Sequence, residues 1–208
     1  MRTIVYVDGF NLYYRALRNT PYKWLNLARL AQLNLSPRNV VTEIKYFTAR
    51  VSARPHDPDQ PVRQDIYLRA LRTLPTVSII FGTFLTTTVR MRLAQPPATG
   101  SATVEVIKTE EKGSDVNIAT HLVHDAHSQR FDVAVVITND SDLCEPIRIV
   151  RQELGLPVGV MYPGVHLSRQ LQPLASFVKP IRQGVLASSQ FPPLLMDAVG
   201  TFHKPPSW

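Results

Sequence analysis

The chain has 208 residues, of which 44% are hydrophobic and 19% charged, and its mean hydropathy is −0.06. This length favours one α/β domain with small additions, and the composition excludes a wholly disordered chain and a membrane protein. The apolar run at residues 4–7 is too short for a signal peptide or a spanning helix. A single cysteine, Cys144, permits no internal disulfide and no thiolate zinc cage. We therefore expect a soluble protein of the cytoplasm, a reducing compartment.

The net charge of +7 is concentrated in the first third of the chain. Residues 1–72 contain 12 basic and 5 acidic residues, whereas the remainder contains 11 of each. Seventeen of the 23 basic residues are arginine, whose planar guanidinium group suits phosphate oxygens. This distribution indicates a polyanionic partner. The alternative is a basic surface that only keeps the protein in solution.

Hydrophobic periodicity predicts alternating strands and helices along the first 87 residues. Asn26 is a favourable cap for the second of these helices. Three prolines in the segment 52–61 indicate an exposed loop. The expected elements are strands at 3–8, 40–51 and 76–87, and helices at 9–18, after Asn26, and at 62–74.

The second half continues the alternation after one interruption. Residues 89–107 predict a polar hairpin with an eight-residue connection, which could overhang a site. Beyond it we expect helices at 114–126 and 141–155, and strands at 132–140 and 157–163. The alternation predicts a mainly parallel sheet covered by helices on both faces. We expect a domain over residues 1–183 and a proline-rich tail over 184–208 that packs on it.

Acidic residues follow two of the strongest predicted strands. Asp8 ends the first strand, Asp140 and Asp142 follow the fourth, and Asp115 opens the helix at 114–126. Each of them alone could be a helix N-cap. Because the carboxyl ends of parallel strands meet at one sheet edge, we expect these acids to converge there, where a cation must relieve their repulsion. An oxygen-only ligand set favours Mg²⁺ or Mn²⁺, which promotes phosphodiester hydrolysis.

Three motifs in this order resemble the NYN domain family, prokaryotic relatives of the PIN-domain nucleases. They are IVYVDGFNLYY (4–14), EEKGSDVNIATHL (110–122) and VVITNDSDLCEPI (135–147). The resemblance extends over residues 2–165, and the ending, SQFPPLL with KPPSW, is similar to the tail of a bacterial branch. It implies a PIN-like α/β fold and a metal-dependent ribonuclease.

The resemblance also implies which residues form the site. Asp8, Asp115 and Asp140 match the family's acidic metal-binding positions, with Asn11 beside the first and Asp142 beside the last. PIN nucleases have a further glutamate, for which Glu111 is only a candidate.

Chemical roles follow for the catalytic set of Asp8, Asn11, Asp115, Asp140 and Asp142. We expect Asp8, Asp115 and Asp140 to hold Mg²⁺ or Mn²⁺ directly or through its bound waters, because Mg²⁺ loses water reluctantly. Asp142 reaches a second ion or orients a metal-bound water. Asn11 donates to the scissile phosphate or supports Asp8. The attacking group is water, so no side-chain nucleophile is needed.

Aromatic and basic residues near the amino terminus suit single-stranded nucleic acid, because rings stack on unpaired bases and guanidinium groups hold the backbone. The alternative is that most of these rings are core, with one or two exposed. His121 is an ordinary helix-surface histidine that might approach substrate. The aromatic residues are Tyr13, Tyr14, Tyr22 and Trp24, and the arginines that could extend a phosphate track are Arg50, Arg54, Arg63, Arg69 and Arg72.

The leading hypothesis is a Mg²⁺- or Mn²⁺-dependent endoribonuclease that acts on RNA. A non-catalytic RNA-binding module of the same fold, whose acids serve only as helix caps, is the alternative. A haloacid-type phosphatase needs a second aspartate where this chain has Phe10, and a Toprim nuclease needs a strand-end glutamate where it has Asp8. Homodimerisation is left open.

Overall fold

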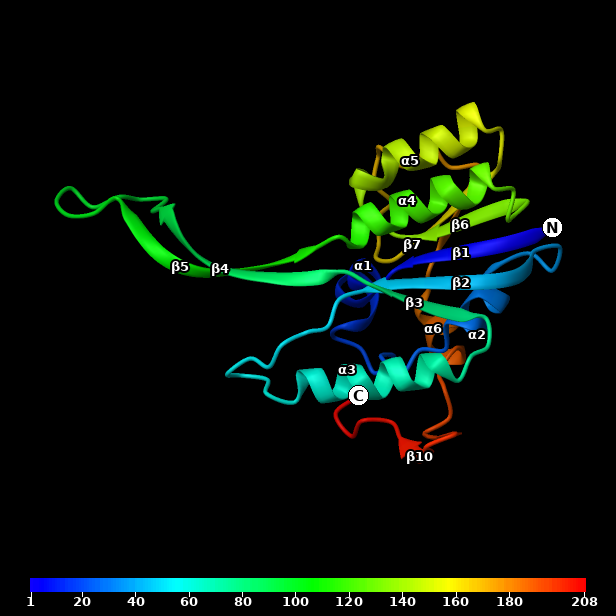
Figure 1. Cartoon of the computed structure of the whole chain (residues 1–208), viewed down its shortest axis with the longest axis horizontal. Helices are drawn as coiled ribbons and strands as arrows, with labels where there is room; N and C mark the ends of the chain where they lie inside the picture. Colours follow the sequence, from blue (N-terminus) through cyan, green and yellow to red (C-terminus); the bar gives the residue numbers. More distant parts are fainter.

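The computed structural model describes all 208 residues. Its centre is a six-stranded sheet in the order β3-β2-β1-β6-β7-β8, in which every neighbouring pair is parallel (Figure 1). The predicted α/β class with a mainly parallel sheet is confirmed. The strands are β1 (Arg2–Asp8), β2 (Val40–Thr48), β3 (Val77–Phe81), β6 (Val133–Ile137), β7 (Val158–Tyr162) and β8 (Phe177–Pro180).

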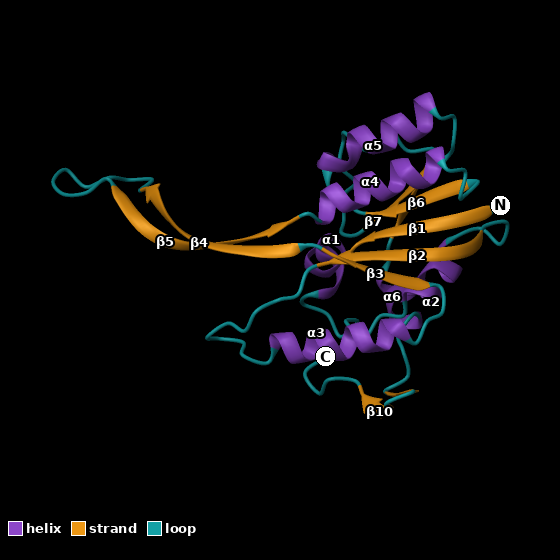
Figure 2. Cartoon of the chain, in the orientation of Figure 1, coloured by secondary structure: helices purple, strands orange, loops and turns teal.

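Helices cover both faces of the sheet and create two hydrophobic cores. Val5 and Val7 of β1 join the core on the side of α2, α3 and α6, whereas Ile4 and Tyr6 join the core under α4 and α5 (Figure 2). No helix combines the length and the apolar character that crossing a bilayer requires. The helices are α2 (Leu27–Asn34), α3 (Gln60–Arg72), α4 (Ser114–His127), α5 (Cys144–Arg148) and α6 (Gln183–Ser188).

Two predicted helices change their hydrogen-bond pattern along their length. The helix expected at 9–18 begins as α1 (Gly9–Leu12) and continues as a π-helical turn, η1 (Tyr13–Leu17). The helix expected at 141–155 begins with a 3-10 turn, η2 (Ser141–Leu143), and ends after α5 with a second π turn, η3 (Ile149–Glu153). Such π turns are frequent at functional sites, and only the four residues of α1 separate η1 from the acidic end of β1.

A long antiparallel hairpin leaves the body at the end of β3. Its strands are β4 (Thr83–Arg92) and β5 (Thr103–Lys112), and it projects far from the sheet (Figure 1). The single strand expected at 76–87 is wrong, because it is divided at Gly82 into β3 and β4, and the hairpin begins at Thr83 rather than Val89. A Cβ atom at Gly82 would clash with the Glu111 carboxylate and lie 2.7 Å from the Lys112 carbonyl oxygen. Glycine therefore allows the two strands to approach closely at the base of the hairpin.

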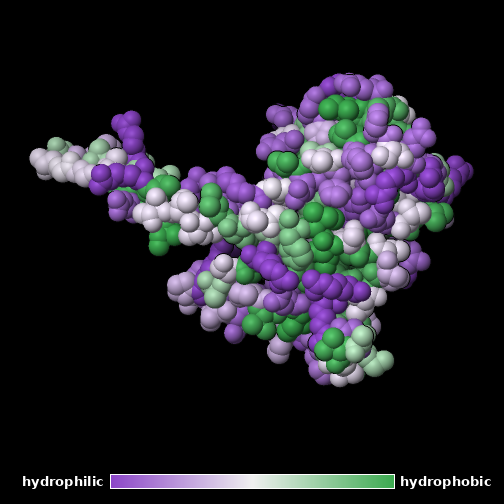
Figure 3. All heavy atoms as spheres, viewed as in Figure 1, coloured by the Kyte–Doolittle hydropathy of each residue, from purple (hydrophilic) through white to green (hydrophobic).

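Hydrophilic and hydrophobic residues both lie on the surface of this projecting hairpin, and no other element covers them in this view (Figure 3). Leu85, Met91 and Ile107 are exposed.

The residues after 183 form structure that the sequence analysis did not resolve. They contain α6 and a short hairpin of β9 (Leu194–Asp197) and β10 (Gly200–His203). The fully buried Trp24 ring packs against Phe191 and Phe202, and its indole N–H donates to the Pro192 carbonyl at 2.8 Å. These residues therefore pack on the core beside α2 and α3.

A buried ion pair joins α4 to the sheet. Lys45 of β2 and Asp125 of α4 are 3% and 0% exposed, and the lysine ammonium donates to the carboxylate. The Tyr6 hydroxyl and the Arg130 guanidinium each donate to the same carboxylate at 2.8 Å. Burial raises the pKa of Asp125, but the hydrogen bonds from Lys45 and Tyr6 bring it below its ordinary value. The satisfied carboxylate fixes α4 on the sheet.

Replacing Lys45 by methionine should strongly destabilise the fold. The substitution leaves the Asp125 charge buried without its closest cation, and breaking such a pair costs about 3–5 kcal/mol. Urea unfolding at neutral pH measures this loss. The matched Lys179→Met variant, at an exposed position on β8 without an ion pair, should change the unfolding free energy by less than about 0.5 kcal/mol. Equal stability of the two variants would contradict a structural role for the pair.

Candidate metal centre

The order of the strands reverses between β1 and β6. From β1 the chain builds outward through β2 and β3, and from β6 it builds in the opposite direction through β7 and β8. In open parallel sheets, ligands bind outside the carboxyl ends of the strands at such a point. Asp8 is the last residue of β1, and Asp140 follows the end of β6 by three residues. Asp115 is in the first turn of α4.

The fold brings these three carboxylates together. One oxygen from each of Asp8, Asp115 and Asp140 lies within 4.8 Å of the other two. Asp8 is buried, and its two oxygens accept hydrogen bonds of 3.0 Å from the Asn11 backbone N–H and the Thr138 hydroxyl. Asp140 is half-buried and accepts from the backbone N–H of residue 142 at 3.1 Å. Asp8 and Asp140 therefore cap helical turns and also belong to the group of three carboxylates.

The close approach of these acids changes their titration. Burial, with the nearby charges of Asp115 and Asp140, raises the pKa of Asp8 to about 6, although the Asn11 and Thr138 hydrogen bonds oppose the shift. Burial and the charges of Asp140 and Glu111 likewise raise the pKa of Asp115. A bound cation would remove this repulsion, and the all-oxygen ligand set suits a hard divalent ion. The residues present therefore fit a divalent metal.

The other expected site residues occupy different places around the cluster. The side-chain oxygen of Asn11, Oδ1, accepts from the Asn139 backbone N–H at 3.0 Å, which ties α1 to the loop after β6. Asn11 also lines the cleft that contains the three carboxylates. Asp142 is exposed and lies outside the group of three. Glu111 lines the cleft and caps α4 by accepting from the Ser114 N–H and hydroxyl at 3.1 and 2.8 Å.

His121 lies away from this cleft. Its Nδ1 is 3.3 Å from the Lys45 ammonium, and its ring meets Phe47 edge to face. Burial, with the nearby Lys45 charge, lowers its pKa. The histidine therefore belongs to the surroundings of the buried ion pair.

The cleft around the carboxylates also contains two arginines and an aromatic wall. Arg15 and Arg54 are exposed, line the cleft and have no acidic partner. Phe84 from the base of the hairpin meets Phe10 edge to face, with ring centres 5.6 Å apart. The sequence analysis missed Phe84 because no local pattern relates the hairpin to the acids. It also missed Thr138, whose position at the end of a predicted strand was an available signal.

Comparison with known proteins places this architecture in a family. The model of the NYN domain family matches residues 2–179. The chain belongs to the NYN domain family. It is 31% identical to 6-hydroxy-3-succinoylpyridine 3-monooxygenase HspA of Pseudomonas putida (strain DSM 28022 / S16), over an alignment of 236 positions that spans the whole chain and 75% of that protein.

The fold of this NYN domain also has a counterpart among solved structures. A crystal structure of a protein of unknown function from Vibrio parahaemolyticus superposes with a TM-score of 0.58 and 15% identity, covering 88% of this chain and 93% of that one. The likeness supports the PIN-like α/β fold expected from the sequence. At this identity it shows the fold alone.

Two expectations about the surface of the NYN domain need correction. Trp24 is fully buried in the core, so it is not a platform for an unpaired base. The expected phosphate track is interrupted because three of its arginines are held by acids. These pairs are Arg50 with Asp65, Arg63 with Asp57, and Arg69 with Asp197.

Binding of Mn²⁺ to this centre should weaken as the pH falls below about 6, the pKa of Asp8 in the folded protein. In more acidic solution a proton occupies this carboxylate and must leave before the cation binds. The association constant, measured by isothermal titration calorimetry, should therefore fall about tenfold per pH unit below that pKa and level off above it. An affinity that does not change across this range would contradict Asp8 as a ligand.

The Asp140→Asn substitution should stabilise the metal-free protein at neutral pH. Asparagine caps a helical turn as well as aspartate does, so the main change is the loss of one repelling charge. In urea unfolding with a chelator present, we expect the free energy of unfolding to rise by about 1 kcal/mol. The matched control is Asp59→Asn, an exposed residue before α3 whose side chain makes no capping hydrogen bond. Equal stabilities of the two variants would contradict repulsion within the cluster.

Proposed function

We propose that this NYN domain is a divalent-metal-dependent endoribonuclease. The observation that carries the proposal is the convergence of Asp8, Asp115 and Asp140 within 4.8 Å at the switch point of the sheet. Membership of the NYN family and two unpaired arginines beside the carboxylates support it. Mg²⁺ and Mn²⁺ are the proposed ions, RNA is the proposed substrate, and the reducing cytoplasm is the proposed location.

The side chains around the centre divide the work of phosphodiester hydrolysis. A divalent ion in such a site polarises the phosphoryl group and lowers the pKa of a bound water. Asp8, Asp115 and Asp140 would hold the ion. Arg15 and Arg54 carry the positive charge that can hold the RNA backbone on either side of the scissile bond. The Asn11 side chain keeps its amide N–H groups for the phosphate, because only its Oδ1 atom is hydrogen-bonded within the protein.

An exposed ring near the cleft supports a single-stranded substrate. Tyr14 is 48% exposed, lines the cleft, and lies under the guanidinium of Arg18 at 5.6 Å from the ring centre. An unpaired base can stack on such a ring, whereas a base inside a duplex cannot reach it. Asp142 is exposed beside the cluster and is proposed to orient water near the ion.

The Asp140→Asn variant should lose RNA cleavage while it keeps RNA binding. The substrate is a circular single-stranded RNA with Mn²⁺ present, because only an endonuclease opens a circle. Removal of one metal ligand should lower the cleavage rate at least about a thousandfold, since the metal supplies most of the catalysis. RNA affinity should stay equal or increase, because a negative charge near the phosphates is removed.

The control for this experiment is again Asp59→Asn, which should cleave at the wild-type rate. Excess chelator should stop wild-type cleavage. Wild-type protein that binds RNA but opens no circle with any divalent ion would overturn the nuclease proposal and support the non-catalytic RNA-binding module.

A second candidate function follows from the curated relative. That protein is named a 6-hydroxy-3-succinoylpyridine 3-monooxygenase. A monooxygenase puts one oxygen atom of O₂ into its substrate, and the other becomes water with two electrons from a reductant and two protons. The test supplies 6-hydroxy-3-succinoylpyridine, O₂ and a two-electron reductant such as NADH, and follows oxygen uptake and the oxygenated product. Turnover here without RNA cleavage would favour the oxygenase over the nuclease.

A further inference from the structure

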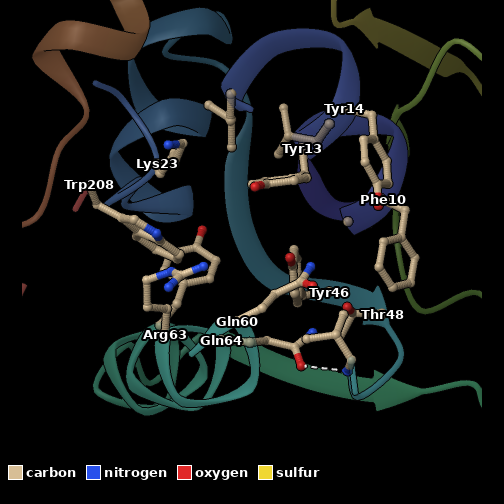
Figure 4. Close-up of a pocket in the computed structure, with 15 residues that line it drawn as sticks. Phe10, Tyr13, Tyr14, Lys23, Tyr46, Thr48, Gln60, Arg63, Gln64 and Trp208 are labelled. Atoms are coloured by element: carbon tan, nitrogen blue, oxygen red, sulfur yellow. Dashed lines mark hydrogen bonds between the residues drawn. The ribbon is translucent and has the colours of Figure 1, made fainter. Parts of the chain in front are cut away.

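A second cavity lies beside the metal centre, and six of its 15 lining residues are aromatic. It is bounded by α1, the π turn η1, the end of β2, and α3 (Figure 4). None of the three clustered aspartates lines it. The two cavities share one wall, made of Phe10 and Tyr14. The six rings around the cavity belong to Phe10, Tyr13, Tyr14, Tyr46, Tyr67 and Trp208.

The cavity is narrow. The volume in which a water molecule can be centred is about 70 Å³, compared with about 370 Å³ in the cleft around the carboxylates. A space of this size and lining favours one flat ring over a bulky or branched group, since flat ligands gain most from aromatic walls.

The aromatic lining is rigid on one side and carries a polar group. The Tyr67 hydroxyl donates to the Leu25 carbonyl at 2.9 Å, and its ring meets the rings of Tyr46 and Trp208 edge to face. Tyr46 is 8% exposed. Thr48 is the polar neighbour of its hydroxyl, and burial raises the pKa of Tyr46, so it stays a neutral donor.

All charged side chains that line the cavity are cationic. Lys23 has no acidic partner, whereas Arg63 is paired with Asp57, which is not part of the lining. The amide group of Gln60 makes no hydrogen bond within the protein and lines the same end. Lys23 and Arg63 lie at the end of the cavity with Trp208, opposite Phe10 and Tyr14 (Figure 4).

We propose that this cavity binds one planar aromatic ring that carries an anionic group. The ring lies between Tyr13 and Tyr46, and the anion lies toward Lys23, the cation of the lining without an acidic partner (Figure 4). Two sources supply this chemistry, a nucleotide with its base and phosphate, or a free aromatic acid. A nucleotide would deepen the proposed nuclease function, because the shared wall places its base next to the metal centre. The binding site itself does not depend on that function.

Two matched pairs of probes test the ligand class with a chelator present. Uridine 5′-monophosphate is compared with uridine, and pyridine-3-carboxylate with pyridine-3-carboxamide, by isothermal titration calorimetry. At least one anionic member should bind about tenfold more tightly than its uncharged partner, because charge-assisted contacts require the anion.

The Lys23→Ala variant should lose this preference. The anionic probe should bind about tenfold more weakly than to wild type, while the uncharged partner is unchanged. The matched control is Lys179→Ala, an exposed position on β8 outside the cavity. Thermal melting of both variants shows that a loss of binding is not a loss of folding.

Tryptophan fluorescence gives an independent readout of where the ring binds. The chain has two tryptophans, Trp208 in the cavity wall and Trp24 fully buried behind it. Stacking or contact of the probe should quench Trp208. In the Trp208→Phe variant, where only Trp24 emits, the quenching should disappear although calorimetry still detects binding.

The outcomes separate the two sources and test the proposal. Tighter binding of the nucleotide identifies a nucleotide site, and tighter binding of the pyridine acid identifies a site for a small aromatic acid. No binding of either anion up to about 10 mM, or binding that Lys23→Ala leaves unchanged, would overturn the proposal. The chelator keeps the metal centre out of this binding measurement. Ring binding in its presence, together with no RNA cleavage by the metal-loaded wild-type protein, would leave this site established and the nuclease proposal refuted.

Discussion

The mutual repulsion of three carboxylates is the constraint on which the functional part of this NYN domain depends. Asp8, Asp115 and Asp140 come from three different elements, and like charges at this separation oppose folding unless the backbone holds them. Asp8 is held because both of its oxygens accept hydrogen bonds, from the start of α1 and from Thr138. Burial of Asp8, with a smaller contribution from the charges of Asp115 and Asp140, raises its pKa. A divalent cation is the partner that turns this repulsion into binding.

The position of Asp115 is fixed by the contacts of its helix. Its helix, α4, is fixed to the sheet by the buried pair of Lys45 and Asp125, and it starts where Glu111 caps Ser114 at the end of β5. Glu111 packs in turn against Gly82, where the chain leaves the sheet to form the hairpin. The projecting hairpin is therefore joined at its base to the same helix that presents the third carboxylate.

Two cavities of opposite character share the wall formed by the first helix. On one side, carboxylates and unpaired arginines suit a cation and phosphates. On the other, aromatic rings and the unpaired Lys23 suit a flat ring with a negative group. Phe10 and Tyr14 line both cavities, so a change in this wall would reach both sites.

The sequence by itself determined the α/β class and the parallel sheet, because buried strands and amphipathic helices have local periods of two and 3.6 residues. It also placed Asp8 and Asp140 at strand ends, which is a local property of the chain. Only the tertiary structure decided which acids meet, that Trp24 is buried by residues near the carboxyl terminus, and that Arg69 is held by Asp197. It also decided that Gly82 meets Glu111 and Lys112 at the base of the hairpin and that six rings surround a cavity. These features depend on pairs of residues far apart in the chain, and their packing leaves no periodic signal in either partner.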